Sequence, residues 1–339
     1  MRVWFNRTFS SVHAAIELIR RDDVDGRFHI IHSNPNPQSP VARAAHEFHP
    51  EPTGLEGQAY LDWCLDFCRT HAVAIFVPGR EATLLAGAHA RFAAVGTRVL
   101  SCASEENLQL IHDKGRFYRE ADLPDAPVAE FRAFRDAAGF EDAYDQLRRR
   151  HAKLCVKPSR SIYGLGFAVL DETRSSAELL MAGAEYHVSL DDFRRALPAL
   201  GEFRDMLLME YLDGREYSVD CVGDNGRLVA AVARRKGTQA GAGQRIDQRA
   251  EILDATARLA QAYGLNGLFN VQFREAGGRA RLLEINPRMS GGIGMACVAG
   301  PNLPYIALAG FADGFDKVEV APVRNGIRVG ELSRAVELA

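Results

Sequence analysis

Residues 282–288 read Leu-Leu-Glu-Ile-Asn-Pro-Arg, and this stretch decides how the whole chain is interpreted. Along a β-strand, side chains two residues apart project from the same face, so Glu284 and Asn286 are expected to lie side by side. The strand ends at Pro287, because proline cannot donate to the hydrogen-bond ladder. Oxygen ligands of this kind suit Mg²⁺, which keeps water and substrate phosphate in its other positions. The stretch predicts a magnesium site, although a plain strand with an acid and an amide on its solvent face also fits it.

Cationic side chains that suit a polyphosphate lie before this stretch and at its end. Lys114 lies in Asp-Lys-Gly-Arg-Phe-Tyr at 113–118, and Lys157 lies in Cys-Val-Lys-Pro-Ser at 155–159. Each ammonium offers three donors to phosphate oxygens, and Arg288 adds a guanidinium next to the predicted metal. A lone lysine is more often a surface charge, but Lys157 lies on a predicted strand, an unusual place for a merely solvated ammonium. The pattern favours phosphate binding.

Two further motifs follow the second lysine. Residues 159–166 read Ser-Arg-Ser-Ile-Tyr-Gly-Leu-Gly, a loop of small residues whose backbone amides suit phosphate. Residues 207–216 read Leu-Leu-Met-Glu-Tyr-Leu-Asp-Gly-Arg-Glu, an apolar strand with a turn after it. Residues 234–236 read Arg-Arg-Lys, which fits either substrate contacts or a solvated strand end. The sequence contains no Rossmann fingerprint and no Walker A motif, which argues against a dehydrogenase or a P-loop enzyme.

The composition is that of an ordinary globular protein. The chain has 339 residues, 47% of them hydrophobic and 25% charged, which is enough for two or three packed units. A net charge of -3 and a pI near 6.4 provide no basic field for nucleic acid or an anionic membrane. No run approaches the roughly 18 apolar residues of a membrane span, and the first residues lack the apolar region of a signal peptide. We expect a cytoplasmic protein.

The six cysteines are scattered, which suits reduced thiols better than disulfides. Cys64 and Cys68 lie four residues apart on a predicted helix, after His46 and His49, so a zinc site is conceivable. Their spacing is not a common zinc motif, and residues 46–52 are predicted to form a polar loop. Buried free thiols are therefore the favoured interpretation.

The order of predicted elements indicates two kinds of sheet. Short apolar runs alternate with helical patterns up to about residue 103, which is typical of a parallel α/β unit. Beyond residue 104 runs of strands and helices are segregated, which suggests an α+β architecture. The predicted strands are 3–5, 28–32, 73–77, 98–100, 152–157, 206–211, 217–222, 228–233, 267–274 and 279–285, and the predicted helices are 11–20, 55–70, 81–92, 104–120, 140–150 and 249–263.

From about Asp113 to about Ala309, these motifs resemble the ATP-grasp superfamily, in particular its carbamoyl-phosphate-synthetase-like branch, which includes biotin carboxylases and several amino acid ligases. The resemblance implies an N-terminal parallel α/β domain over 1–103, a small domain with its linker helix over 104–212 and a large C-terminal domain over 213–339. It also implies that ATP and Mg²⁺ are the cofactors.

The resemblance further assigns roles to single residues. The main chain of Glu210 and Leu212 edges the adenine, Glu216 takes the ribose hydroxyls, and the loop from Ser159 covers the phosphates. Simpler interpretations of the same residues are a core strand, a turn and an exposed acid. The implied ligands are Gln272, Glu284 and Asn286 for magnesium, and Lys114, Lys157, Ser159, Gly164, Gly166, Glu210, Leu212 and Glu216 for the nucleotide, with Arg288 and Lys157 catalytic.

The metal interpretation sets a condition on the hairpin that joins the strands of Gln272 and Glu284. For these side chains to share a face, the loop must have an odd number of residues, such as 276–278, which pairs Gln272 with Leu282. A two-residue loop of Gly277 and Gly278 would instead pair Gln272 with Leu283. The sequence therefore predicts a three-residue loop.

The resemblance implies an ATP- and magnesium-dependent ligase that activates a carboxylate as an acyl phosphate and couples it to an amine, with amino acid or peptide-like substrates. Two alternatives stay open: a carboxylase-type enzyme that activates bicarbonate, and an ATP-binding regulator without turnover. Small molecules are the expected partners, with no nucleic acid and no membrane. The sequence does not fix the oligomer size, and a homodimer is one option.

Overall fold

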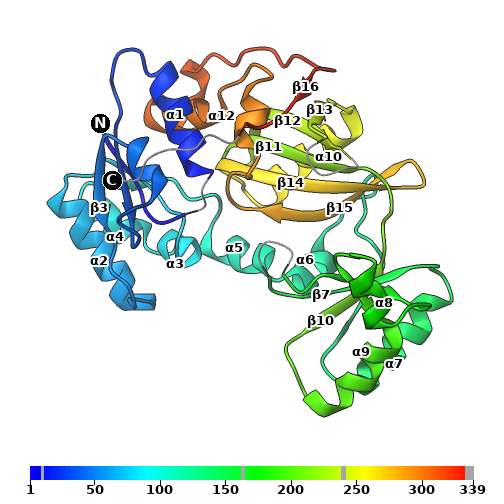
Figure 1. Cartoon of the computed structure of the whole chain (residues 1–339). Coiled ribbons are helices and arrows are strands. Elements are labelled where there is room, and N and C mark those ends of the chain that lie inside the picture. Colours follow the sequence, from blue (N-terminus) through cyan, green and yellow to red (C-terminus); the bar gives the residue numbers. More distant parts are fainter. Residues whose placement is uncertain (9–10, 162–164, 238–241, 333–339) are drawn as a thin grey trace. The chain divides into compact units, whose positions relative to one another are not determined.

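The structure is a computed structural model, and its described residues form two compact units (Figure 1). Unit 1 comprises three segments and unit 2 comprises two, so the chain passes from one unit to the other several times. The predicted domain boundaries at residues 103 and 212 stay a prediction. The described residues are 1–8, 11–161, 165–237 and 242–332. Unit 1 is Met1–Gln109, Arg215–Phe273 and Glu284–Ala339, and unit 2 is Leu110–Gly214 and Arg274–Leu283.

The first sheet of unit 1 is parallel throughout, with the strand order β3-β2-β1-β4-β5. The alternation of strands and helices in this part of the sequence is therefore confirmed as a parallel α/β fold. The predicted helix over 81–92 is divided into two short helices at Gly87. The elements are β1 (Arg2–Phe5), α1 (Val12–Asp22), β2 (His29–Asn34), η1 (Pro40–Arg43), β3 (Glu47–Pro50), α2 (Gly57–Thr70), β4 (Ile75–Val77), α3 (Ala82–Ala86), α4 (His89–Ala94) and β5 (Arg98–Val99).

Strand β3 corrects the prediction of a polar loop over residues 46–52. It pairs in parallel with β2, with Glu47 opposite Ile31 and His49 opposite Ser33. β3 is the last strand of its sheet, so only one of its edges is paired and its side chains are partly exposed. An edge strand of this kind does not need alternating apolar and polar side chains. A prediction based on that alternation therefore misses it.

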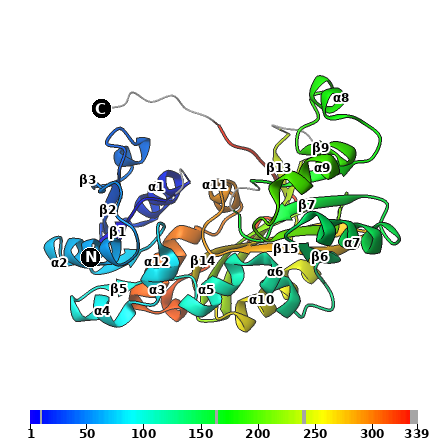
Figure 2. The same ribbon diagram turned by 90° about the horizontal axis from the view of Figure 1, so that it is seen from below.

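Alternating side chains of β1 supply two different cores, one on each face of the parallel sheet. Val3 and Phe5 join a core with α1, α11 (Ile293–Cys297) and α12 (Leu303–Asp313). Trp4 points the other way and packs with residues of α2, α3 and α4. Figure 2 shows α1 and α2 on opposite sides of this sheet. Because the first core contains residues from both ends of the sequence, the N-terminal sheet and the C-terminal helices belong to one compact unit.

The second sheet of unit 1 has six strands in the order β15-β14-β11-β12-β13-β16. β11 and β12 form an antiparallel ladder that pairs Tyr217 with Arg235. Together with the sheet of unit 2 it confirms the predicted α+β architecture after residue 104. Its elements are β11 (Glu216–Asp224), β12 (Arg227–Lys236), β13 (Gln244–Ile246), α10 (Ala250–Ala262), β14 (Gly267–Ala276), β15 (Arg279–Asn286), η3 (Phe315–Lys317) and β16 (Arg328–Val329).

Unit 2 is built on a five-stranded sheet with the order β6-β10-β7-β8-β9, in which only β8 and β9 are parallel. Phe140, Leu147 and Leu208 are at most 1% exposed and form the centre of its core. The predicted helix over 104–120 is interrupted at Asp113, which caps a second helix. The remaining elements are α5 (Glu105–His112), α6 (Lys114–Glu120), β6 (Phe131–Phe134), α7 (Ala137–Arg148), β7 (Leu154–Pro158), β8 (Ala168–Asp171), α8 (Ser176–Met181), β9 (His187–Ser189), α9 (Leu190–Ala196), η2 (Leu197–Leu200) and β10 (Met206–Glu210).

Among the described helices, none combines the length and the apolar character that crossing a membrane requires.

Trp4 tests the packing of the parallel sheet. Its indole is fully buried, stacks on Phe76 at 4.1 Å and on Phe67 at 4.3 Å between ring centroids, and donates to Ser33 Oγ at 3.0 Å. Trp4→Ala leaves a cavity among these groups and is expected to reduce the free energy of unfolding of this part by about 3–5 kcal/mol. Urea unfolding measures the change. The control Val24→Ala, at an exposed position, should change it by less than about 0.5 kcal/mol, and a similar small change for Trp4→Ala would contradict the packing.

Candidate active site

The end of β15 brings three of the predicted site residues together. Asn286 Nδ2 donates to Glu284 Oε1 at 3.0 Å, so the acid and the amide lie side by side as their spacing predicts. Arg288 donates to Asn286 Oδ1 at 3.3 Å and to the carbonyl of Met289 at 2.9 Å. All three site side chains are partly exposed. A carboxylate, an amide and a guanidinium therefore share one accessible strand end.

The hairpin before this strand has a two-residue loop, so the prediction of a three-residue loop was wrong. β14 ends at Ala276 and β15 begins at Arg279, which leaves Gly277 and Gly278 as the turn. Both glycines have positive φ, 57° and 80°. Two residues in this conformation form the tight turn that matches the twist of paired strands. The two glycines provide it without the strain that a side chain would add.

The spacing of buried side chains changes along β15. Ala280, Leu282 and Ile285 are buried, so the step between buried side chains grows from two residues to three. An extra residue of this kind is what a β-bulge inserts into one strand of a pair. One inserted residue would offset the short loop and bring Glu284 opposite Gln272. Gln272 lies partly exposed on β14, and its role as third metal ligand stays a prediction.

In unit 2 the two predicted nucleotide lysines lie on adjoining elements. Lys157 on β7 donates to Tyr118 Oη at 2.7 Å and lies 4.9 Å from the centre of that ring. The Tyr118 hydroxyl donates in turn to the carbonyl of Leu283. Lys114, one turn before Tyr118 on α6, is 8% exposed and donates to the carbonyl of Ser161 at 3.0 Å. Protein oxygens thus hold both ammonium groups in defined positions.

Ser159 ties the start of the predicted phosphate loop to α6. Its hydroxyl donates to Asp113 Oδ1 at 2.8 Å and accepts from the amide of Gly115 at 3.0 Å. Asp113 caps α6 and also receives Arg160 at 3.2 Å. Burial alone would raise the pKa of Asp113, but the hydrogen bonds from Ser159, from the amide of Arg116 and from Arg160 lower it. The aspartate therefore stays ionised and fixes the loop beside Lys114.

The rest of the predicted phosphate loop is described in part. Gly164 lies outside the described residues. Gly166 has a φ of +81°, and a Cβ there would lie 2.8 Å from Pro158 Cγ. Only glycine meets both conditions, so Gly166 is needed for the path of the chain, and its contact with phosphate stays a prediction.

The predicted adenine strand is well ordered within the sheet of unit 2. The amide of Glu210 donates to the carbonyl of Glu130 at 2.9 Å, and its own carbonyl lies 3.9 Å from the Cys155 sulfur. Leu212 follows and is 4% exposed. The main chain of Glu210 and Leu212 could contact the edge of an adenine from these positions, and this role also stays a prediction.

In unit 1, Glu216 is engaged by a cation. The register of β11 and β12 places it opposite Lys236, whose ammonium forms an ion pair with it. Arg235 in turn lies 3.6 Å from Asp247 Oδ2. These two cations of the Arg-Arg-Lys motif therefore neutralise carboxylates on their own sheet, and the ribose role of Glu216 stays a prediction.

Sequence reasoning singled out Arg234 but missed its buried partner, Asp220. Arg234 is 2% exposed, and its Nε donates to Asp220 Oδ2 at 2.8 Å, so a solvated strand end is wrong for this position. Its NH2 group donates to Ser218 Oγ at 3.2 Å and to Ser290 Oγ at 2.9 Å. A Cβ at Gly292 would lie 2.5 Å from its NH1 group. The signal in the sequence was a pair of charges, Asp220 and Arg234, inside otherwise apolar strands.

Comparison with known proteins places this arrangement in a family. Residues 202–335 match the family model described as ATP-grasp in the biosynthetic pathway with Ter operon. Carnosine synthase 1 of Mus musculus is 39% identical over 104 residues, which are 27% of this chain and 13% of that protein. The arginine-specific carbamoyl phosphate synthase large chain of Geobacillus stearothermophilus is 29% identical over 198 residues, 53% of this chain and 16% of that protein. The matches thus span less than a fifth of either relative.

The fold agrees. The crystal structure of an L-amino acid ligase from Bacillus licheniformis matches with a TM-score of 0.61 and 12% identity, covering 94% of this chain and 77% of that one. Residues 202–335 are thus similar to an ATP-grasp family, and the fold of nearly the whole chain is similar to that of this ligase. The resemblance seen in its motifs, including the carbamoyl-phosphate-synthetase-like branch, is confirmed. The strand end at Glu284 lies within the matched residues, and the two lysines of unit 2 precede them, so their nucleotide roles stay predictions.

The buried ion pair of Asp220 and Arg234 can be tested by removing one partner. Asp220→Ala leaves Arg234 buried without its carboxylate and is expected to lower the free energy of unfolding by about 3–5 kcal/mol. The double variant Asp220→Leu/Arg234→Met should recover much of that loss, because no buried charge remains unpaired. Denaturant unfolding measures both.

Asp224→Ala is the matched control, because Asp224 pairs with Arg227 near the surface at 2.8 Å and should contribute at most about 1 kcal/mol. A loss for Asp220→Ala that is no larger than the loss for this control would contradict the assignment.

Proposed function

We propose that this protein is an ATP- and Mg²⁺-dependent ligase that activates a carboxylate as an acyl phosphate and couples it to an amine. The observation that carries the proposal is the contact of Glu284, Asn286 and Arg288 at one accessible strand end. Carboxylate and amide oxygens suit Mg²⁺, and a guanidinium suits phosphate oxygens. Similarity of residues 202–335 to an ATP-grasp family supports reading this group as part of a nucleotide site.

The donor set fits a magnesium ion. Glu284 supplies two carboxylate oxygens, Asn286 supplies Oδ1, and Gln272 would supply a third side-chain oxygen from β14. When bound, Mg²⁺ neutralises charge on the nucleotide phosphates. Arg288 now donates to Asn286 Oδ1, the atom that would coordinate the ion. With Asn286 Oδ1 bound to the ion, the Arg288 guanidinium would be available to phosphate oxygens.

The nucleotide phosphates would be held by the lysines of unit 2. Lys157 is restrained by Tyr118 and Lys114 by Ser161 O, so both ammonium groups are already oriented. Phosphoryl transfer needs little covalent help from protein, and positioning together with charge stabilisation supplies most of the rate. Glu210, Leu212 and Glu216 would hold adenine and ribose, and Ser159, Gly164 and Gly166 would line the phosphate loop.

The reaction that we propose has two balanced steps. A carboxylate oxygen of the first substrate attacks the γ-phosphorus, the bond to the bridging oxygen breaks, and ADP leaves with an acyl phosphate formed. An amine then attacks the acyl carbon, phosphate leaves, and the amine loses a proton as the amide forms. Arg288 would stabilise charge on the transferred phosphoryl oxygens in both steps. Because one similar structure is named an L-amino acid ligase and one relative a carnosine synthase, we propose amino acids as the substrate class.

The proposal is tested by a substrate screen. The protein is incubated with ATP, Mg²⁺ and pools of amino acids, and ADP, phosphate and new masses are measured. We expect at least one pool to stimulate ADP release about tenfold or more over background. The new mass should equal two substrates less one water. Hydroxylamine added to the same pools should give a hydroxamate, because it captures an acyl phosphate whatever the natural amine is.

Other outcomes of the screen would overturn the proposal in distinct ways. ADP release that depends on bicarbonate alone would indicate a carboxylase-type enzyme. Nucleotide binding without stimulation by any pool and without hydroxamate would indicate a regulator. Glu284→Gln is the background control, because it removes the proposed carboxylate ligand while keeping the size of the side chain.

Separate variants distinguish nucleotide binding from the chemical step. Arg288→Met should lower kcat by about 10²–10³-fold, the typical effect of losing one donor to a developing charge, while the Kd for ATP changes little. Lys157→Met should instead weaken ATP binding by about 10- to 100-fold, the equivalent of one charge-assisted hydrogen bond. Steady-state kinetics and calorimetric titration measure the two effects.

The exposed cations Arg279 and Lys153 provide matched controls, as Arg279→Met on the same strand and Lys153→Met close to β7. Both should retain normal kcat and ATP affinity. An Arg288→Met enzyme with unchanged kcat would contradict the proposed role of the guanidinium.

A further inference from the structure

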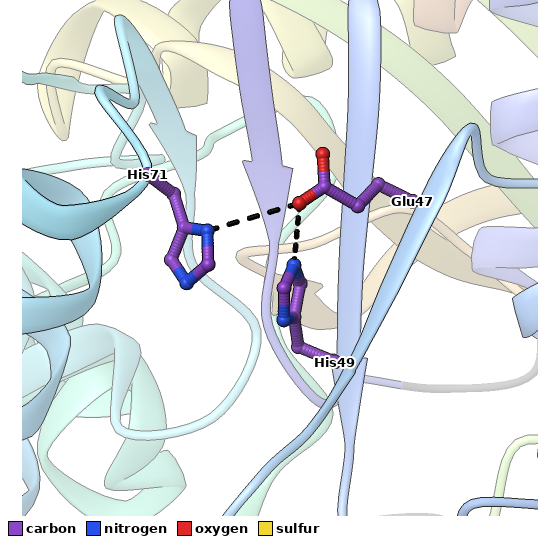
Figure 3. Close-up of side chains that lie close together, drawn as sticks. All are labelled: Glu47, His49 and His71. Atoms are coloured by element: carbon purple, nitrogen blue, oxygen red, sulfur yellow. Dashed lines mark hydrogen bonds and ion pairs between the residues drawn. The ribbon is translucent and has the colours of Figure 1, made fainter.

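Outside the nucleotide site, a carboxylate and two imidazoles converge at the edge of the parallel sheet (Figure 3). Glu47 Oε1 lies 2.6 Å from His49 Nε2 and 3.7 Å from His71 Nδ1. One ligand atom from each residue lies within 4.8 Å of the others. In the part of the chain that the structure describes, no other group of three His, Cys, Asp or Glu side chains comes as close.

The fold brings these residues together from two elements. Glu47 and His49 lie two residues apart on β3 and so project from the same face of the strand. His71 follows the last residue of α2, and its carbonyl accepts Arg2 Nε at 2.6 Å, which fixes the end of the helix to β1. Phe67 supports both rings, with centroids 4.2 Å from His71 and 5.3 Å from His49. The imidazoles are thus positioned by packing.

The two oxygens of Glu47 have different partners. Oε2 receives Arg2 NH2 at 2.6 Å and lies 3.1 Å from His29 Nε2. Oε1 lies next to His49 and His71, as Figure 3 shows. Arg2 and His29 therefore hold one oxygen and orient the other, which is how groups around a metal commonly fix its ligands.

We propose that Glu47 Oε1, His49 Nε2 and His71 Nδ1 bind one Zn²⁺ ion, with water in the fourth position. Zinc bonds to imidazole nitrogen and carboxylate oxygen of about 2.0–2.2 Å place tetrahedral ligands about 3.4 Å apart, a value between the two measured separations. Small movements of the side chains complete the geometry. The three side chains are 29%, 27% and 22% exposed, so an ion and a water molecule can reach them.

The ligand types support a transition metal rather than magnesium. Imidazole nitrogen suits zinc, whereas magnesium prefers oxygen ligands. The two nearby cysteines do not compete, because both are buried, and burial raises the pKa of the Cys68 thiol to about 12. The site is independent of the proposed ligase activity.

Zinc binding to the full chain tests the proposal directly. The protein is freed of metal with a chelator and titrated near pH 7.5 with Zn²⁺ in a calorimeter and with Co²⁺ in a visible spectrometer, without nucleotide. We expect one ion per chain and the visible bands of Co²⁺ with imidazole ligands. His49→Ala and His71→Ala should each weaken binding by at least about 100-fold, since even the groups that orient ligands are worth about 10- to 100-fold.

Two controls locate the ion. His187→Ala removes an exposed histidine of β9 and should leave stoichiometry and affinity unchanged. Glu284→Gln removes a proposed magnesium ligand and should also leave zinc binding intact. Binding that is lost in Glu284→Gln and retained in His49→Ala would overturn the proposal. So would the absence of stoichiometric binding and of the Co²⁺ bands in the unsubstituted protein, a result that does not depend on any variant folding.

Discussion

A guanidinium buried in a sheet must be paired, and the ion pair of Arg234 with Asp220 meets this constraint at the centre of unit 1. Asp220 is fully buried on β11 and Arg234 is 2% exposed on β12, so neither charge can be left without the other. The remaining donors of Arg234 reach Ser290, in the loop that follows Arg288. The pair thereby links the ladder of the sheet to the loop next to the predicted phosphate site, and close contact with Gly292 leaves that loop little freedom.

The face of β15 that carries Glu284 depends on the length of the turn before the strand. A two-residue turn at Gly277 and Gly278 alone would place Gln272 opposite Leu283, away from the face of Glu284. The spacing of buried residues grows from two to three between Leu282 and Ile285, and one inserted residue there would restore the shared face. We predicted a three-residue loop so that Gln272 and Glu284 would share a face. The two glycines indicate a turn, but they do not fix its length. Bulges depend on partners across the sheet, which a single strand does not reveal.

Features that depend on residues close together in the sequence could be predicted, and features that depend on the pairing of distant strands could not. The parallel sheet was predictable because its central strands are buried on both faces and read as apolar runs. The contact of Glu284 with Asn286 was predictable because it depends only on the period of a strand. Arg234 with Asp220 was not, because their pairing requires the register of two strands. β3 was missed since its stability comes from main-chain bonds to β2, and these leave no mark on side-chain hydrophobicity.

The missed strand and the histidine cluster are connected. Once residues 47–50 are a strand, the spacing of Glu47 and His49 has the same consequence as that of Glu284 and Asn286: two polar side chains on one face. The chemistry differs because the second ligand differs, an imidazole in one case and an amide in the other. Imidazole nitrogen is a ligand for zinc and amide oxygen a ligand for magnesium. The two proposed cation sites would therefore differ in selectivity, although both are built on the two-residue repeat of a β-strand.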